Sequence, residues 1–443
     1  MLSAFVDAFR TPDLRKKILF TLMILVVFRF GSVLPTPNVN LVNVNACRAI
    51  ASADEATAGL YSMINLFSGG ALLQLAVFAL GIMPYITASI ILQLLAVVIP
   101  HLEALKKEGG AGQQKITQYT RYLTIVLAVL NSTTFVTLAV NGQLFNGCDP
   151  SLYPLVYDKG IFSLIVMILT MTAGTGVIMW LGELITERGV GNGMSVMIFT
   201  QIAAQFPSSL WGIKESQGAT NEATGWFYFL LVMAIGLLIM AAVIFVEQGQ
   251  RRIPVQYAKR MVGRKLIGGS TTYIPIKVNQ SGVIPVIFAS SLLYLPSLYA
   301  QFVPDSPVSG WIAANMTNGD SVAYNVVYSA LIIAFCYFYV SITFNPVEIA
   351  DNMKKYGGFI PGVRAGEPTA RYLKFVISRL TAPGSLYLAI VALIPTLAFI
   401  FLGTFSKFPF GGTSILIIVG VGLDTVKQIQ SQLQQRNYEG FLR

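Results

Sequence analysis

Residues 60–75 read LYSMINLFSGGALLQL and run directly into the apolar stretch 76–99. The segment is moderately apolar, but it is shorter than the roughly 20 residues that a helix needs to cross a bilayer. We expect a half-helix that dips into the membrane from outside, because no loop is long enough to return. Broken backbone at membrane depth is tolerated only where protein or water shields it. The segment therefore predicts an interior cavity; an amphipathic helix on the outer surface is the alternative.

The composition of the 443 residues indicates that lipid is the main solvent. Hydrophobic residues make up 54% and charged residues 11%, whereas soluble domains carry about 25% charged residues. The mean hydropathy is +0.66. We predict an all-α polytopic membrane protein with ten transmembrane helices. The spans are 17–34, 76–99, 121–140, 161–181, 194–213, 226–246, 280–302, 323–344, 380–402 and 413–430.

The placement of Lys and Arg predicts the orientation in the membrane. With ten spans, 25 of the 30 basic residues fall on one side. The opposite side has only Arg48, Lys159, Lys214 and Lys407, and Arg29 lies within the first span. Because positive loops stay inside, both termini and the two largest basic loops, 247–279 and 345–379, should be cytoplasmic. Residues 1–16 would form a surface-lying amphipathic segment or a disordered tail, and 431–443 a cytoplasmic tail.

Ten spans divide into two halves of five, and an odd number per half inverts the second half relative to the first. We expect an N-terminal half at 17–213, an external connection at 214–225 and a C-terminal half at 226–430. The spans contain almost no ionisable residues, whereas ion-coupled carriers usually keep such groups as relays. No nucleotide-binding, metalloprotease or serine-hydrolase motif occurs. We therefore expect no enzyme, no cofactor and no metal site, and any driving energy must come from a partner or a gradient.

Several features point to contacts beyond lipid. Ile82, Ile86, Ser89 and Gln93 share one face of the second span, which suggests that this face meets protein or water. The loop at 247–279 holds seven basic residues and paired turn glycines, so we expect a protruding β-hairpin. Anionic lipid is one partner for it; its length favours a macromolecule, for which RNA is a candidate. Cys47 and Cys148 fall outside, where either a disulfide or two free thiols is possible.

Several stretches of the sequence, quoted below, are similar to the SecY family, whose members are the central subunit of the bacterial Sec translocon. The similarity runs through the whole chain. It includes FRFGSVLPTP near 28–37, NLFSGGAL at 65–72, FALGIMPYITASIILQLL at 78–95, KKEG near 106–109, GELITERGVGNGMSVMIF at 182–199, GQRRIPVQYAKR at 249–260, IPIKVNQSGVIPVIFASS at 274–291, FNPVEIADNMKKYGGFIPGVRAGEPTARYL at 344–373 and FGGTS at 410–414.

The resemblance implies two hinged halves around an hourglass channel, with 60–75 as a plug. An apolar pore ring would comprise Ile82, Ile86, Ile198, Ile287 and Ile417, and the plug would include Asn65, Phe67, Ser68, Gly69 and Gly70. A lateral gate for signal sequences would open between spans two and three and spans seven and eight. Ser89, Gln93, Asn131 and Ser291 are the candidates for weak polar contacts there.

The resemblance also implies partners. The basic loops would dock a ribosome or the SecA motor through Arg251, Arg252, Lys259, Arg260, Arg264, Lys265 and Arg364. Lys265 and Gln248 depart from the basic residues expected there, which puts a bidentate contact at the hairpin tip in doubt. SecE and SecG would be small membrane partners. The implied function is a plasma-membrane channel for signal-bearing unfolded polypeptides, with sideways release of transmembrane segments. An inverted-repeat carrier or lipid flippase is the alternative.

Overall fold

The computed structural model describes residues 9–53, 69–142, 144–145, 148–149, 152–217, 222–257, 260–262, 265–267, 271–302, 306–316, 321–394 and 412–441. The amphipathic segment expected at the N-terminus and the plug residues Asn65, Phe67 and Ser68 lie outside these ranges. All statements below concern the described residues.

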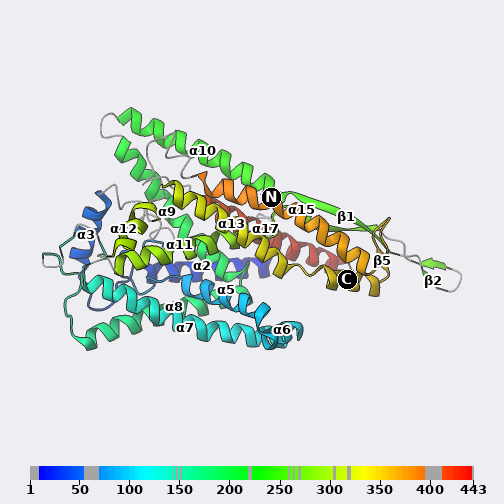
Figure 1. Cartoon of the computed structure of the whole chain (residues 1–443), viewed down its shortest axis with the longest axis horizontal. Coiled ribbons are helices and arrows are strands. Elements are labelled where there is room, and N and C mark those ends of the chain that lie inside the picture. Colours follow the sequence, from blue (N-terminus) through cyan, green and yellow to red (C-terminus); the bar gives the residue numbers. More distant parts are fainter. Residues whose placement is uncertain are drawn as a thin grey trace.

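The architecture is a bundle of long helices that run roughly along the long axis of the molecule (Figure 1). Ten of them overlap the ten predicted spans, which confirms an all-α polytopic membrane fold. They are α2 (Pro12–Val33), α5 (Met83–Val98), α7 (Gly110–Val140), α8 (Ile161–Arg188), α9 (Gly193–Gln217), α10 (Glu222–Gln248), α11 (Ile284–Phe302), α13 (Val322–Thr343), α15 (Glu367–Ala392) and α17 (Gly412–Phe441). Shorter helices are α3 (Leu41–Ala53), α6 (Pro100–Lys107), α12 (Pro307–Asn315) and α14 (Pro346–Lys355).

Not every predicted span is a long apolar helix on its own. Within the described part of the chain, five helical stretches satisfy both length and hydropathy for crossing a membrane: α7, α8, α10, α15 and the stretch Val322–Lys355. A sixth is counted if α5 and α6, which meet at a bend of 105°, form one span. The expected division into two inverted halves stays a prediction.

The sequence prediction for residues 69–82 is wrong, because this stretch is a chain of turns rather than helix. Positive φ angles at Gly69, Gly70, Leu75 and Gly81 interrupt regular structure. The helix α5 starts only at Met83, seven residues later than expected, with Pro84 in its first turn. Proline is favoured there because its missing N–H is not needed, so Pro84 begins the helix instead of bending it. We call residues 69–82 the turn segment.

The turn segment passes between α2 and α8. Gly31 on α2 leaves room for the ring of Phe78, which a Cβ atom at position 31 would overlap. Gly174 on α8 likewise leaves room for the carbonyl oxygen of Val77. These close approaches hold the segment inside the helical bundle, where its backbone is shielded.

The predicted hairpin is confirmed. Strands β1 (Gln250–Tyr257) and β4 (Thr271–Lys277) pair antiparallel, and β2 (Arg260–Val262) pairs with β3 (Lys265–Ile267) toward the tip. The hairpin projects beyond the helices (Figure 1), and we call this end of the molecule the hairpin end. Strand β5 (Gly358–Phe359), from the second large basic loop, adds to the free edge of β1. The two basic loops are therefore one folded unit, which the sequence pattern did not indicate.

Apolar packing divides the core into several clusters. The largest two draw on residues 39–171 and 232–419, respectively. A third joins the hairpin base to α14 and α15 through Ile253, Val255, Ile276, Met353 and Leu373. At the end opposite the hairpin, Cys47 on α3 and Cys148 form a disulfide with Cα atoms 5.5 Å apart. The structure thus pairs the two thiols that the sequence left open.

Candidate functional site: an isoleucine ring below a polar cavity

Four helices bring isoleucine side chains together near the centre of the bundle. Ile287 and Ile417, from α11 and α17, pack with Ile202, and the partly buried Ile86 and Ile198 contact the same cluster. Ile82 belongs to an adjoining cluster that also contacts Ile86 and Ile198. All five predicted ring residues are therefore close to one another. We call these five residues with Ile202 the isoleucine ring.

Ile202 is the ring member that sequence reasoning missed. It is only 1% exposed and lies four residues after Ile198 on α9, on the same helical face. That spacing was the available signal.

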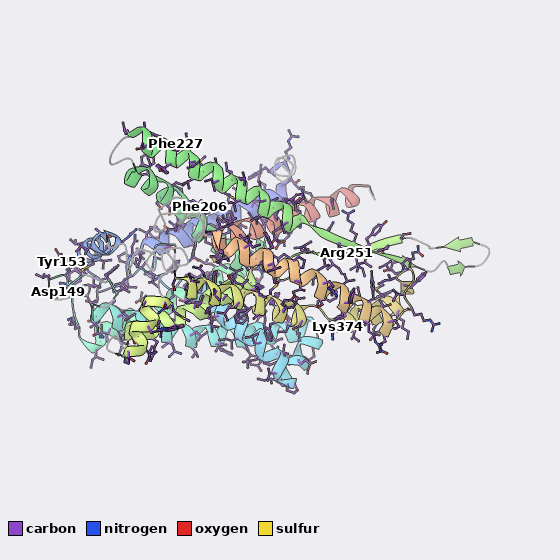
Figure 2. All side chains as sticks on the ribbon, turned by 45° about the horizontal axis from the view of Figure 1, so that its top comes forward. Asp149, Tyr153, Phe206, Phe227, Arg251 and Lys374 are labelled. Carbon is purple, nitrogen blue, oxygen red and sulfur yellow. A yellow bond between two sulfur atoms is a disulfide. The ribbon has the colours of Figure 1, made fainter. Side chains whose placement is uncertain are left out.

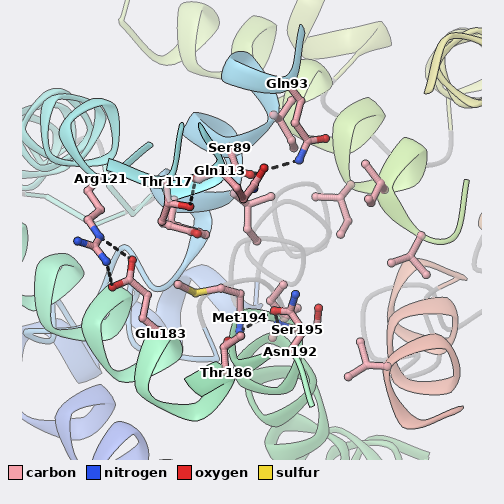
Figure 3. Close-up of a pocket in the computed structure, with 18 of the residues that line it drawn as sticks. Ser89, Gln93, Gln113, Thr117, Arg121, Glu183, Thr186, Asn192, Met194 and Ser195 are labelled. Atoms are coloured by element: carbon pink, nitrogen blue, oxygen red, sulfur yellow. Dashed lines mark hydrogen bonds and ion pairs between the residues drawn. The ribbon is translucent and has the colours of Figure 1, made fainter. Parts of the chain in front are cut away.

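A cavity of about 700 Å³ opens on one side of the ring. Ile86, Ile198, Ile287 and Ile417 line it together with polar residues, so the isoleucines form its apolar floor. Figure 3 shows Ser89, Gln113 and Thr117 facing Met194, Ser195 and Asn192 across this space. Gln113 and Asn192 of this lining belong to stretches between the predicted spans, whereas Ser89 and Gln93 lie on α5.

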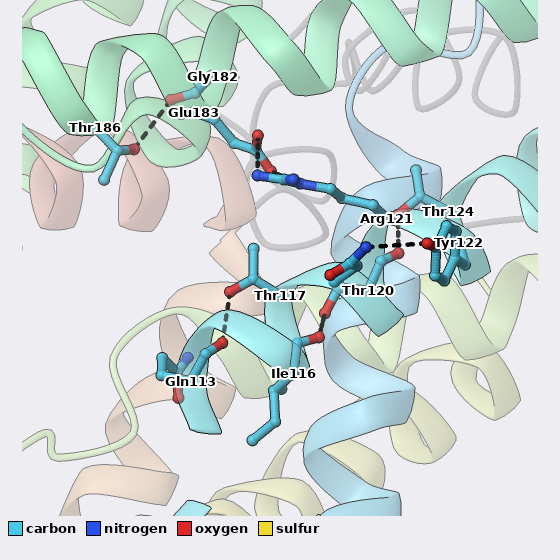
Figure 4. Close-up of polar contacts among 11 residues, drawn as sticks. Gln113, Ile116, Thr117, Thr120, Arg121, Tyr122, Thr124, Gly182, Glu183 and Thr186 are labelled. Atoms are coloured by element: carbon cyan, nitrogen blue, oxygen red, sulfur yellow. Dashed lines mark hydrogen bonds and ion pairs between the residues drawn. The ribbon is translucent and has the colours of Figure 1, made fainter. Parts of the chain in front are cut away.

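An ion pair stiffens the cavity wall. Arg121 on α7 donates from Nε and Nη2 to the two carboxylate oxygens of Glu183 on α8, both at 2.8 Å. Such a bidentate pair fixes the relative position of the two helices. Along α7, Thr117, Thr120 and Thr124 donate their hydroxyls to backbone carbonyls one turn earlier (Figure 4). These threonine hydroxyls are thus satisfied within α7. The sequence analysis did not identify the Arg121–Glu183 pair.

The turn segment contacts α2 and α9 close to the ring. The Nη1 of Arg29 donates to the carbonyl oxygen of Gly69, 3.3 Å away. Gly69 and Gly70, two of the predicted plug residues, are buried. Thr36 anchors the middle of the segment by donating its hydroxyl to the carbonyl of Leu75 at 2.7 Å. Arg29, which lies within the first span, is therefore hydrogen-bonded to the backbone of the predicted plug.

The four predicted gate residues lie on three helices, α5, α7 and α11. Gln93 donates weakly to Ser89 on its own helix at 3.4 Å, and Ser291 donates to the Ile287 carbonyl at 2.8 Å. Asn131 is half-buried on α7. Within the described residues, these hydrogen bonds stay inside single helices, and none of them ties α5 to α11.

The predicted docking residues that the structure describes lie at the hairpin end. Arg251 and Arg252 are exposed on β1, where Ile253 and Val255 face the core. Arg251 and Lys374 are at the same end of the molecule, far from Asp149 and Tyr153 at the other (Figure 2).

Arg364 is exposed in the loop after β5, and its carbonyl accepts a hydrogen bond from the Thr369 hydroxyl at 2.8 Å. Arg260 and Lys265 lie on β2 and β3. Lys259 and Arg264 fall outside the described residues.

The family model described as SecY matches residues 76–426, which is most of the chain. The chain belongs to the SecY family. The match includes all six members of the isoleucine ring, together with the hairpin and the second basic loop.

Curated members of the SecY family match along the entire chain. The protein named "Protein translocase subunit SecY" from Streptomyces galbus is 63% identical, with all of both chains covered. The protein of the same name from Mycobacterium bovis is 57% identical at the same coverage.

Solved structures agree in fold. "The structure of a protein conducting channel" aligns with a TM-score of 0.62 at 17% identity, covering 94% of this chain and 91% of that one. "Sec61 in the Canine ribosome-channel complex from the endoplasmic reticulum" aligns with a TM-score of 0.59 at 17% identity, covering 94% and 91%. At this identity the likeness concerns the fold.

Proposed function

We propose that this chain is the channel-forming subunit of a protein translocase. It would conduct signal-bearing unfolded polypeptides across the membrane and release transmembrane segments sideways into lipid. The observation that carries the proposal is the isoleucine ring at the floor of a polar cavity. The names of its full-length relatives, translocase subunits of the SecY family, support the same function.

The chemistry of the ring suits a passage for unfolded chains. An apolar constriction resists water and ions by dewetting. Isoleucine side chains offer no charge or hydrogen bond to a passing segment, so they do not select one sequence over another. The ring would close around a polypeptide, and the turn segment with the residues before it would seal the resting channel.

Sideways release would use the seam between α5 and α11. The polar residues Ser89, Gln93 and Ser291 bond within their own helices. A seam without strong cross-helix bonds can open at low cost, since membrane hydrogen bonds contribute only about 0.6 kcal/mol on average. A signal sequence would insert between these helices; Asn131 on α7 would add a further weak polar contact.

The hairpin end would dock the machinery that drives transport. Arg251, Arg252 and Arg364 are exposed there, and Arg260 and Lys265 lie on β2 and β3 of the hairpin. Lys259 and Arg264, outside the described residues, would join the same docking surface. Ribosomal RNA presents phosphates that arginine binds well, and the SecA motor would use the same surface. SecE and SecG would be the small membrane partners, and anionic lipid would surround the basic loops.

The charge distribution supports the location that we propose. The chain would lie in the bacterial plasma membrane with both termini and the hairpin end in the cytoplasm, because the basic residues concentrate on that side.

The test is transport by the reconstituted complex. Proteoliposomes containing the chain, its small partners, SecA and ATP should protect a signal-bearing precursor from protease. Arg364→Glu should reduce protection strongly, because it reverses a charge on the docking surface. Lys159→Glu, an exposed change outside the hairpin end, is the matched control.

The outcomes test the translocase function and the docking role of Arg364 separately. Failure of the wild type under conditions that energise a known Sec channel would reject the translocase and favour the carrier or flippase. Transport that Arg364→Glu leaves unchanged would keep the function but remove Arg364 from the docking surface.

A further inference from the structure

Two polar side chains flank the backbone of the turn segment beside the isoleucine ring. Arg29 reaches it from α2 and donates to the Gly69 carbonyl at 3.3 Å. Gln201 reaches it from α9 and is 1% exposed. Arg29 is ionisable, and ionisable residues within membrane spans are rare and usually functional.

The two side chains meet at the same point of the segment. A Cβ atom at Gly69 would stand 3.3 Å from Gln201 Cγ and 3.4 Å from Arg29 Nη1. At the other end of the segment, a Cβ atom at Gly81 would stand 2.6 Å from Gln201 Nε2. Both glycines have positive φ, +64° and +55°. Gln201 therefore lies against both ends of the folded turn, in space that only glycine leaves open.

The bonding of the two side chains differs. Arg29 has a backbone carbonyl as its acceptor, and a hydrogen bond from a charged donor is among the stronger kinds in proteins. The Nε2 of Gln201 is fully buried and has no acceptor among the described residues. A buried donor without an acceptor destabilises the state in which it occurs.

We propose that Arg29 and Gln201 set the balance between the closed and open channel in opposite directions. The Arg29 bond to Gly69 stabilises the closed state by holding the turn segment at the ring. The buried amide of Gln201 destabilises the same state and gains an acceptor, water or a passing backbone carbonyl, when the segment moves away. The proposal rests on the channel function proposed above and assigns two positioning residues to its gating.

This arrangement gives a reason for an arginine within a membrane span. Its charge costs free energy in the bilayer, and the acceptor that offsets this cost belongs to a segment that must move. Opening breaks one hydrogen bond from a charged donor and gives one unsatisfied donor access to an acceptor. The closed state is therefore favoured at rest, while the free-energy difference from the open state stays small.

The experiment measures the resting ion conductance of the complete complex in planar bilayers, without precursor or motor. Arg29→Met removes the donor while keeping an apolar chain of similar length, and it should raise resting conductance about tenfold, the loss expected for one hydrogen bond from a charged group. Arg29→Lys keeps a charged donor and should fall between Met and wild type. Gln201→Leu keeps a side chain of similar volume and removes the amide whose Nε2 lacks an acceptor, so it should lower resting conductance.

Matched controls lie on the same helices. Arg15→Met on α2 and Gln205→Leu on α9 should leave conductance unchanged. Precursor transport by each variant, measured with a weak signal sequence, should follow the same order as conductance: faster for Arg29→Met and slower for Gln201→Leu. Thermal unfolding of each purified complex shows that the variants are folded.

The signs of the two effects decide the outcome. Conductance that moves in the same direction for both residues, or that matches the controls, would overturn the proposal. Conductance is measured without precursor, so it tests the gating proposal separately from transport. A wild-type complex that blocks ions but never transports a precursor would reject the channel function. A wild-type complex that transports precursor, with Arg29 and Gln201 variants of unchanged conductance, would reject only the gating role of these two residues.

Discussion

At the scale of single residues, the isoleucine ring combines burial with contact to a polar cavity. Ile202 and Ile417 are each 1% exposed, while Ile86 and Ile198 face the cavity in part. A polar group at one of these positions would bring water into the ring, and a wetted constriction no longer excludes ions by dewetting.

Replacement of Ile417 by Ser is therefore expected to raise the resting ion conductance of the channel. The rise should be about tenfold if wetting removes roughly 1.4 kcal/mol of the barrier to ions. Single-channel recording in planar bilayers measures it. Val326→Ser, at an exposed position on α13, is the control; an equal rise in that variant, or none at Ile417, would show that the ring is not the ion barrier.

At the scale of elements, glycines set how closely the turn segment approaches its neighbours. On α8, Gly174 faces the Val77 carbonyl, whereas a Cβ atom at Gly176 would have no atom within 4 Å. The two positions are two residues apart on one helix, and they differ in the atoms that an added Cβ would meet.

Gly174→Ala is expected to destabilise the protein by about 1–3 kcal/mol, because the added methyl group overpacks a backbone atom that cannot yield. Gly176→Ala should be neutral or slightly stabilising, since alanine favours helix. Thermal unfolding in detergent compares the two. Equal melting temperatures would mean that the turn segment can shift away from α8.

The three-stranded sheet at the hairpin end is the second element with a testable contact. A Cβ atom at Gly358 on β5 would stand 3.0 Å from the ring of Tyr257 on β1. Gly358→Val should therefore separate β5 from the hairpin, weaken the sheet by about 1 kcal/mol and expose the loop at 345–366 to limited proteolysis. Gly310→Val, in open space on α12, is the control. Unchanged cleavage would indicate that β5 tolerates the larger side chain.

At the scale of the whole molecule, the disulfide closes the end opposite the hairpin. It joins residues 101 apart in sequence, and Cys47 belongs to the same apolar cluster as Leu72 and Leu75 of the turn segment. One covalent bond therefore supports the packing that holds this segment.

Loss of the disulfide is expected to lower the free energy of unfolding by about 2–4 kcal/mol, mainly because a long loop of the unfolded chain is released. Unfolding curves with and without reductant measure the change. A Cys47→Ser, Cys148→Ser double variant should have the same free energy of unfolding as the reduced wild type, and reductant should not change it. A reductant effect that persists in the double variant would show that the change in stability does not come from this disulfide.

Local pattern alone predicted much of this protein. Apolar runs of membrane length identified the spans, and alternating residues between turn glycines predicted the hairpin, because both signals lie within one segment. The face shared by Ile82 and Ile86 was likewise visible in the sequence, since four-residue spacing returns to the same side of a helix.

The remaining features depend on residues far apart in the chain. Residues 69–82 are apolar enough for helix, yet they form turns, and Gly31 and Gly174 leave room for these turns between two helices. The Arg29 bond to Gly69 spans 40 residues, and β5 reaches β1 across about a hundred. Hydrophobic periodicity records which side of an element is buried, but it carries no information on which distant element covers it. That partner is selected by packing and hydrogen bonding in the folded bundle.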